Sequence, residues 1–369
     1  LVKKKIQDKS RILMSLPFLK NLVKKKAKII IISHLGRPKG EKNNELSLTP
    51  IYKFLKEQLE TKVFFFMGEI NDETKSKFDY LKEGEIILLE NIRFYEGENK
   101  NDDSFAKILA SLGDIYINDA FSCSHREQAS IHKITKYIKE SYAGPLLKKE
   151  VAAINSVIQN KKKPVTCIIG GSKISTKINV IINLIKNVNN VIIIGAMANN
   201  FLTFKGFVIG KSLIEKNTAE VIKKIYVEAK KYNCNIFTPE DCCVSTDLKG
   251  SGKTKELDSI SKEEMILDIG PKTVKNIESI IDQSNTVLWN GPAGYFENKS
   301  FSNGTLAIAK KISGCTARKS LISILGGGDT ISAVNMSKNK FTFTHLSTAG
   351  GAFLEFLEGK DLPGLNVLK

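Results

Sequence analysis

Short runs of β-branched and other apolar residues alternate with amphipathic segments along the whole chain. The runs predict strands at 28–33, 63–67, 85–89 and 114–118, and again at 165–169, 190–194, 235–237, 286–289 and 321–325. Continuous apolar runs indicate strands buried on both faces, and the helical segments between them make neighbouring strands parallel. The pattern therefore predicts an α/β fold, with a doubly wound parallel sheet formed twice.

A helical segment separates the two series of strands. Gly144 and Pro145 break the chain, residues 146–159 follow a helical pattern, and residues 160–164 are polar. We interpret this helix as the connection between two α/β domains. Another helix is expected at 49–59, where Pro50 occupies a first-turn position that suits proline.

Charge and composition limit the function classes. The net charge of +17 favours anionic partners, but the lysine runs are dispersed among acidic residues and form no basic stripe with aromatics. Nucleic-acid binding stays open as a minor alternative. The six cysteines form no CxxC pair, and with four histidines a zinc site is disfavoured. A reduced, cytoplasmic compartment fits best, and no apolar run approaches the roughly 20 residues of a membrane span.

Arginines follow three strands of the first half, close to the point where each strand ends. His34 and Arg37 follow the first strand, Arg93 follows the third, and Arg126 follows the fourth. Ligands of open parallel sheets bind beyond the carboxyl ends of the strands. Because the guanidinium fork suits phosphate and carboxylate, these strand ends predict an anion site.

Strands of the second half end in glycine. The glycines are Gly170 and Gly171, Gly195, Gly291 and Gly294, and Gly326, Gly327 and Gly328. Glycine lets backbone N–H groups approach a ligand, and a helix that begins just beyond adds the positive end of its dipole. Asp329 and Thr330 stand at such a helix start, although they could equally be ordinary N-caps. Together the glycine-ended strands predict a nucleotide site.

Several other motifs are weaker. Residues 204–212 resemble a Walker A loop but are one residue too short, and the lone histidines His132 and His345 are interpreted as structural. The chain shows no Gly-x-Ser-x-Gly elbow and no evident acid–base pair. Phosphoryl transfer needs positioning and charge stabilisation more than proton chemistry, so these absences favour it.

Taken together, the motifs resemble the phosphoglycerate kinase family along essentially the whole chain. They are SHLGRP (33–38), LLENIRF (88–94), NDAF…HR (118–126), GGSKISTK (170–177), LDIGP (267–271), WNGPAGYFE (289–297), GGGDT (326–330) and STAGGAFLEFLEGKDLPG (347–364). The resemblance implies two Rossmann-like domains joined by an interdomain helix. It also implies reversible phosphoryl transfer between MgATP and 3-phosphoglycerate, giving 1,3-bisphosphoglycerate and MgADP in glycolysis.

The resemblance also implies roles for individual residues. Substrate binding would fall to Arg11, His34, Leu35, Gly36, Arg37, Arg93 and Arg126. Nucleotide binding would fall to Gly171, Lys173, Lys177, Gly195, Gly270, Asn290, Glu297, Gly327, Gly328, Asp329 and Thr330, with Asp329 as the Mg²⁺ ligand. Arg11, Lys173 and the amides of Gly350 and Gly351 would stabilise the transferring phosphoryl group.

The implied domains are 1–143 for phosphoglycerate, 144–160 as a hinge helix and 161–353 for the nucleotide. The segment 354–369 would pack back on the first domain. We expect a cytoplasmic monomer that acts on small molecules, with neither nucleic acid nor membrane as partner.

The chain begins at Leu1, and the family's first strand, which carries an Asp and an Asn, is expected to precede it. Ser122, Ala196 and Ala349 replace family glycines, and an inactive nucleotide-binding paralogue is the alternative function.

Overall fold

The computed structural model describes residues 6, 9–158, 162–337, 339–347 and 349–369. It divides into two compact units, Leu1–Lys149 with Asp361–Lys369, and Glu150–Lys360. Residues 159–161, which hold the end of the predicted hinge and the first residue of the predicted nucleotide domain, lie outside the described residues. The proposed domain boundaries remain predictions.

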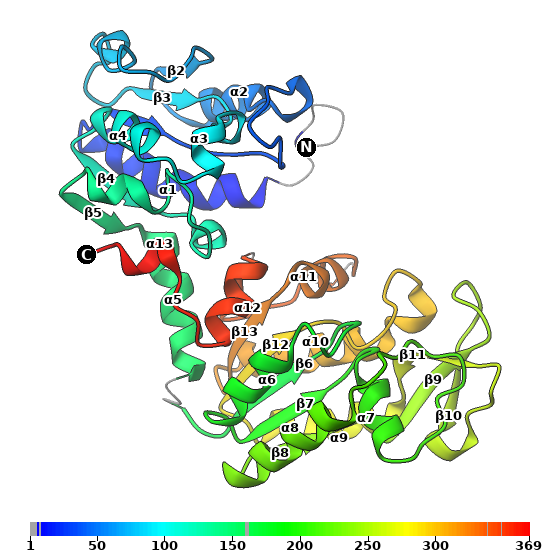
Figure 1. The fold of residues 1–369 in the computed structure, drawn as a ribbon. Coiled ribbons are helices and arrows are strands. Elements are labelled where there is room, and N and C mark those ends of the chain that lie inside the picture. Colours follow the sequence, from blue (N-terminus) through cyan, green and yellow to red (C-terminus); the bar gives the residue numbers. More distant parts are fainter. Residues whose placement is uncertain (1–5, 7–8, 159–161, 338, 348) are drawn as a thin grey trace. The chain divides into compact units, whose positions relative to one another are not determined.

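The first unit contains a parallel sheet covered by helices on both faces (Figure 1). Its strand order is β1–β3–β2. The next two strands of the chain, β4 and β5, form a separate parallel pair. The strands are β1 (Ile29–Ile31), β2 (Val63–Phe66), β3 (Ile86–Leu89), β4 (Ile115–Asn118) and β5 (Glu140–Ala143). The helices are α1 (Ser10–Lys24), α2 (Thr49–Gln58), α3 (Glu96–Asn99), α4 (Asp103–Ser111) and α13 (Pro363–Asn366), and α5 (Pro145–Ile158) begins here.

Alternate residues of β3 face two different hydrophobic clusters. Ile86 and Leu88 pack with residues of α1 and α2, whereas Ile87 and Leu89 pack with residues of α4. Successive side chains of a strand point to opposite faces of the sheet, so a central strand covered on both sides must be apolar throughout. This is why the four residues of β3 are fully buried and form an unbroken apolar run.

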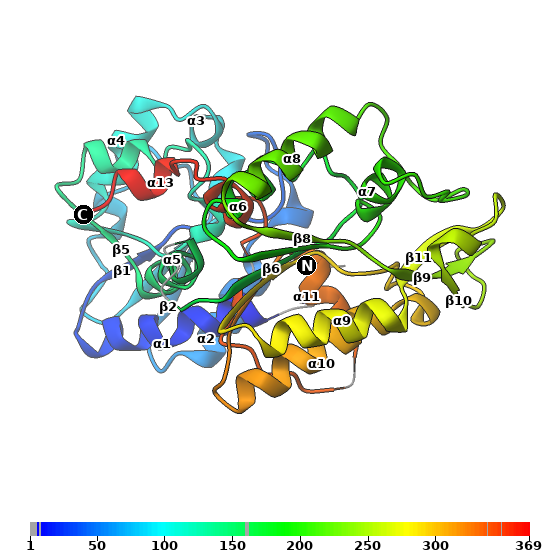
Figure 2. The same ribbon diagram turned by 90° about the horizontal axis from the view of Figure 1, so that it is seen from below.

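The second unit is built on a six-stranded parallel sheet of order β14–β13–β12–β6–β7–β8. Figure 2 shows helices on both sides of β6 and β8. Its strands are β6 (Val165–Ile169), β7 (Asn190–Ile193), β8 (Asn235–Phe237), β12 (Thr286–Asn290), β13 (Ile322–Gly326) and β14 (His345–Ser347). Its helices are α6 (Ile178–Ile185), α7 (Ala198–Phe204), α8 (Ala219–Lys231), α9 (Pro271–Asp282), α10 (Asn303–Ala317), α11 (Gly328–Asn335) and α12 (Gly351–Leu357). A small antiparallel sheet contains β9 (Asp241–Ser245), β10 (Lys253–Glu256) and β11 (Met265–Ile269).

Each predicted strand is present with its ends within two residues of the predicted ones, and both predicted helices are present. The pattern missed β5, the antiparallel strands β9 to β11, and β14. Short strands carry little periodicity, and β10 is largely exposed and polar, so an apolar pattern could not reveal them.

The last residues of the chain pack against β4 and the turn that follows it. Asn118 Nδ2 donates to Gly364 O at 3.1 Å, and Gly364 N donates to Ser124 O at 2.8 Å. A Cβ on Gly364 would lie 2.9 Å from Ser124 Cα, so only glycine permits this approach. The C-terminal segment therefore supports the turn that carries Arg126.

Candidate active site

Three strand-end turns of the first unit meet at the guanidinium of Arg93. Arg93 Nη1 donates to Gly36 O at 2.8 Å, in the turn after β1, and Nη2 lies 3.4 Å from Gln128 Oε1, beyond β4. Asn91, on the same turn as Arg93, donates from Nδ2 to Leu35 O at 2.7 Å. The arginine is 5% exposed, so its position is set by these contacts. The structure thus brings together the turns that carry the residues singled out by the strand-end pattern.

His34 lies among the positive charges of this cluster. The pKa of His34 is lowered to about 4, first by burial and then by the charges of Arg93, Arg126 and Arg11. The effect of Arg11, from the first turn of α1, shows that this residue also lies near the cluster. His34 is therefore neutral at physiological pH, and an anion bound here would offset the mutual repulsion of the arginines.

The remaining cations of the cluster differ in exposure. Arg37 is exposed, and Arg126 is half-buried with its Nε donating to His125 Nε2 at 3.2 Å. Buried Glu98 fixes the chain beyond Arg126, since its carboxylate accepts from Ser130 N at 2.8 Å and Ser130 Oγ at 2.7 Å. The exposed side chain of Arg37 can move to contact a ligand, whereas the guanidinium of Arg93 is held in place by its hydrogen bonds.

In the second unit, Lys177 lies where β6 and β12 end. Its ammonium donates to Gly170 O at 2.5 Å and to the side-chain oxygen of Asn290. Asn290 Nδ2 donates onward to Gly326 O at 2.9 Å, at the end of β13. The pKa of Lys177 is lowered to about 8, because burial outweighs the opposing charge of Asp329. One lysine thus connects the ends of neighbouring strands.

Two glycines allow close backbone approach around this lysine. Gly195 has φ +69°, and a Cβ there would lie 2.8 Å from Gly171 N. Gly327 has φ +97°, and its Cβ would lie 2.8 Å from Asn290 Nδ2. Side chains at either position would be strained and would collide with these neighbouring atoms. Glycine at such positions is typical of backbone that approaches a phosphate.

Helix α11 begins directly in front of the lysine. Gly327 is its N-cap, and Thr330 Oγ1 accepts from Gly291 N at 2.7 Å while donating to Gly326 O at 3.0 Å. Thr330 is thus used in holding the turns together. Gly328 and Asp329 are exposed in the first turn, so they are accessible to a ligand.

Asp329 is the residue whose chemistry fits a metal. Among the described residues, no group of three or more His, Cys, Asp or Glu side chains could hold a metal ion. Mg²⁺ commonly binds through one or two carboxylates together with substrate phosphates. An exposed carboxylate in the first turn of α11, close enough to Lys177 to influence its pKa, fits a metal that arrives with a nucleotide.

Lys173 stands exposed in the loop between Gly171 and Lys177. Its backbone oxygen accepts from Thr176 Oγ1 at 2.9 Å. The same loop is bonded to Glu215, whose carboxylate accepts from Ser175 N and Oγ. Sequence reasoning missed Glu215, and it also missed Gln128 beside Arg93, because neither residue lies in a recognised motif.

The other predicted residues are less closely connected to these two clusters. Gly270 is required locally, since its Cβ would lie 2.3 Å from the Asp241 carboxyl group that caps α9. Glu297 is exposed in the turn after β12. Gly350 has φ +53° and precedes α12, and Gly351 is exposed at the first position of that helix. Their roles remain predictions.

The motifs set aside in the sequence have structural explanations. In the segment 204–212, a Cβ on Gly210 would lie 2.2 Å from Glu264 O, so this turn packs on backbone and does not enclose a phosphate. His345 Nε2 lies 2.9 Å from Glu150 Oε2 in a buried pair, and His132 Nδ1 lies 3.2 Å from Asn101 Nδ2. In the described part of the chain, no helix is both long and apolar enough to span a membrane.

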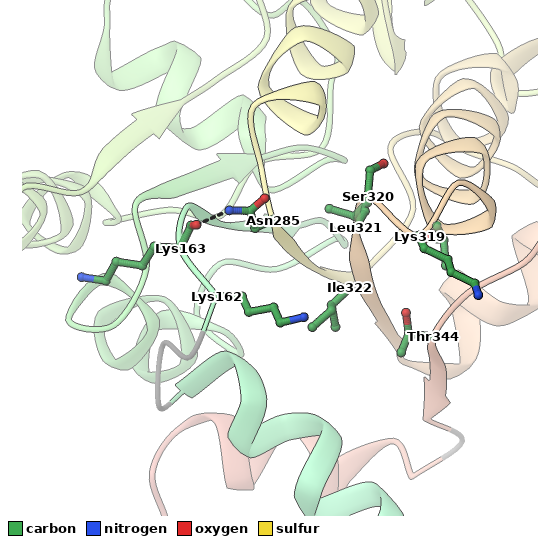
Figure 3. Close-up of a pocket in the computed structure, with 9 residues that line it drawn as sticks. Lys162, Lys163, Asn285, Lys319, Ser320, Leu321, Ile322 and Thr344 are labelled. Atoms are coloured by element: carbon green, nitrogen blue, oxygen red, sulfur yellow. Dashed lines mark hydrogen bonds between the residues drawn. The ribbon is translucent and has the colours of Figure 1, made fainter.

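A cavity of about 600 Å³ lies at the opposite edge of the six-stranded sheet, where the strands begin (Figure 3). It is lined by Lys162, Lys163, Asn285, Thr316, Lys319, Ser320, Leu321, Ile322 and Thr344. Helix α10 ends next to Lys319, and lysine is favoured where helices end with exposed carbonyls. Figure 3 shows the ammonium groups of Lys163 and Lys319 pointing away from one another. The end of α10 therefore explains Lys319 without an anionic ligand.

Comparison with known proteins agrees with the motifs. The phosphoglycerate kinase family model matches residues 1–360. A phosphoglycerate kinase of Wolbachia sp. subsp. Drosophila simulans (strain wRi) is 45% identical over 366 residues, covering 99% of this chain and 92% of the relative. That of Rhizobium meliloti (strain 1021) is 42% identical, with the same coverage.

Solved structures give the same result. The structure of phosphoglycerate kinase from Coxiella burnetii matches with a TM-score of 0.89 and 37% identity, covering 100% of this chain and 92% of that one. Phosphoglycerate kinase from Pyrococcus horikoshii OT3 matches with a TM-score of 0.81 and 28% identity, covering 100% and 93%. The two units of this chain, each with a parallel sheet, agree with the two Rossmann-like domains that the resemblance implies. The chain therefore belongs to the phosphoglycerate kinase family and is a kinase with that activity.

Proposed function

We propose that the arginine cluster of the first unit binds 3-phosphoglycerate and that the glycine-ended strands of the second unit bind ATP with Mg²⁺. The observation that carries the proposal is the meeting of three strand-end turns at Arg93, next to the neutral His34. Phosphate and carboxylate are the anions that arginine forks bind bidentately. A phosphoglycerate carries both groups.

The second cluster has the features of a phosphate site. It combines the buried ammonium of Lys177, the start of α11 and exposed Lys173. Asp329 would ligate Mg²⁺, which would neutralise charge on the phosphate oxygens. Gly171, Gly195 and Gly327 would keep backbone amides accessible, and Asn290 would orient Lys177. Gly270 and Glu297 would contact the nucleoside, as the family resemblance implies.

Phosphoryl transfer to 3-phosphoglycerate requires little proton transfer by the protein. The acceptor is a carboxylate, which is already ionised at neutral pH, so no general base is needed. The protein's task is to place donor and acceptor in line and to neutralise the charge of the transferring group. Arg11, Lys173 and the amides of Gly350 and Gly351 would supply that neutralisation.

A coupled assay tests the function itself. With 3-phosphoglycerate and MgATP, formation of 1,3-bisphosphoglycerate can be followed through NADH oxidation by a reducing enzyme. Turnover is expected, and no turnover while ATP still binds would favour the inactive nucleotide-binding paralogue.

A filter-binding assay tests the nucleic-acid alternative. Binding of DNA or RNA that persists at physiological salt would favour a nucleic-acid partner, since binding by charge alone weakens steeply as salt rises.

The role of Lys173 is tested by Lys173→Ala. The exposed side chain has little part in packing, so the variant should fold normally. If the ammonium acts mainly on the transferring group, kcat should fall about a hundredfold while the KM for ATP changes little. An unchanged kcat would contradict the assignment.

We further propose that the enzyme is a cytoplasmic monomer.

A further inference from the structure

The loop that carries Lys173 is anchored on both sides of that residue. Gly171 O accepts from Met197 N at 2.9 Å, and the side chain of Lys177 returns to Gly170. Ile174 is completely buried, whereas Lys173 is exposed. The lysine therefore projects from a short segment whose backbone position depends on the contacts of its neighbours.

Glu215 supplies one of these contacts from outside the loop. Its Oε2 accepts from Ser175 N at 3.0 Å, and its Oε1 accepts from Ser175 Oγ at 2.5 Å. Both carboxylate oxygens thus hold one residue, two positions beyond Lys173. The pKa of Glu215 is lowered, first by the Ser175 hydroxyl and then by its N–H, with a further contribution from the charge of Lys173. Lys173 is therefore within electrostatic range of this carboxylate.

Glu215 is itself tied to a buried helix. Asn200 of α7 is 2% exposed, and its Nδ2 donates to Glu215 O at 2.8 Å and to Thr218 Oγ1 at 2.9 Å. Asn199, also buried, donates from Nδ2 to Leu213 O at 3.0 Å. The segment that carries Glu215 is thus held at two carbonyls, and through the carboxylate the Lys173 loop is joined to α7.

We propose that Glu215 is a positioning residue that sets where the Lys173 ammonium stands for phosphoryl transfer. The inference rests on the proposed function of Lys173. Glu215 acts in two ways. Its hydrogen bonds fix the backbone at Ser175, and its charge draws the lysine toward one side of the loop. A displacement of a catalytic group by about 1 Å can change the rate by orders of magnitude, so a side chain that touches no substrate can control turnover.

Glu215→Ala tests the proposal in the full chain. We expect kcat to fall about tenfold, with little change in the KM for 3-phosphoglycerate and in the midpoint of thermal unfolding. Glu215→Asp keeps the charge and should recover part of the loss. Ser175→Ala keeps the backbone bond and should cause a smaller loss, of about threefold. Glu220→Ala, which removes an exposed carboxylate at the start of α8, is the matched control and should behave as the unchanged chain.

The double variant Lys173→Ala/Glu215→Ala separates positioning from a general effect on structure. If Glu215 acts through Lys173, its removal should cost nothing further once the lysine is absent, because the two effects are not additive. A full tenfold further loss would overturn the proposal. So would an unchanged kcat in Glu215→Ala when Lys173→Ala is impaired. Unchanged kcat in Lys173→Ala alone would instead refute the proposed function of that lysine.

Discussion

Burial lowers the proton affinity of one basic side chain in each candidate site. The pKa of His34 is lowered to about 4, and that of Lys177 to about 8. In both cases desolvation is the largest cause. A bound anion favours the charged form of a nearby base, so substrate binding should raise both pKa values. The two sites can therefore be examined separately by titration.

His34 should remain neutral down to about pH 5 in the free enzyme. Its pKa in the unfolded chain is near 6.5, so below that pH the unfolded state binds the additional proton. The contribution of His34 to stability is therefore complete above pH 6.5 and is lost as the pH falls toward 4. NMR titration can resolve it because the chain has four histidines. A His34 resonance that titrates near pH 6.5 without substrate would contradict the described burial.

Lys177 should take up protons when a nucleotide binds. Near pH 8 about half of the free molecules carry the proton, because burial lowers the pKa to about 8. Phosphate oxygens next to the ammonium would complete the protonation. Calorimetry of ADP binding at pH 8, in buffers of different ionisation enthalpy, measures this uptake. Lys177→Arg, which stays charged, should lose it, and equal uptake in that variant would assign the proton to another group.

Several of the site residues follow from the sequence for a physical reason. Arg93 and Arg126 were predicted because parallel strands deliver their following residues to one edge, and the structure brings them together with Gly36. The roles of Gln128 and Glu215 could not be predicted, because each lies in a loop without a motif. Each contacts its site only through a hydrogen bond to a residue far away in the sequence, Arg93 or Ser175. Such partners become visible only when the chain is folded.

At the scale of elements, capping decides the start of α9. Asp241, from the first position of β9, accepts from Lys272 N at 2.9 Å and from Thr273 N at 2.8 Å. It is 2% exposed, so its partners would be left without an acceptor if it were removed. The neighbouring Gly270 must lack a side chain to admit this carboxylate. A glycine that the family resemblance associates with nucleotide thus also has a structural cause.

Asp241→Ala should therefore lower the free energy of unfolding by about 2 kcal/mol, through the lost cap and the unpaired buried donors. Denaturant unfolding monitored by circular dichroism measures the loss. Asp258→Ala removes an exposed carboxylate of the same unit and should change stability by less than about 0.5 kcal/mol. Equal stability of the Asp241 variant and the unchanged chain would show that the cap is dispensable.

Elements differ in how well the sequence predicts them. The central strands β3, β6 and β12 are buried along their whole length, and they were recognised from apolar runs. The strands β9 and β11 form a bulged antiparallel pair, where Asp268 is buried and accepts from Gly304 N at 2.8 Å. A polar residue satisfied by a distant amide breaks the apolar pattern, so this sheet could not be found from the sequence.

At the scale of the molecule, the two residue clusters belong to different units. We assign one substrate to each unit, and the transferred group must pass from one substrate to the other. We therefore predict that 3-phosphoglycerate and ATP together lower the radius of gyration measured by small-angle scattering, because turnover requires the substrates to meet and water to be excluded. Each substrate alone should have a smaller effect. An unchanged radius with both substrates would contradict the predicted hinge.

The central claim is that the arginine cluster serves 3-phosphoglycerate and not the nucleotide. Its most direct test is steady-state kinetics of Arg37→Ala, with both substrates varied. Arg37 is exposed, so its removal should leave the fold intact. We predict that the KM for 3-phosphoglycerate rises about tenfold or more while the KM for ATP is unchanged. An unchanged KM for 3-phosphoglycerate, or a matching rise in the KM for ATP, would contradict the account.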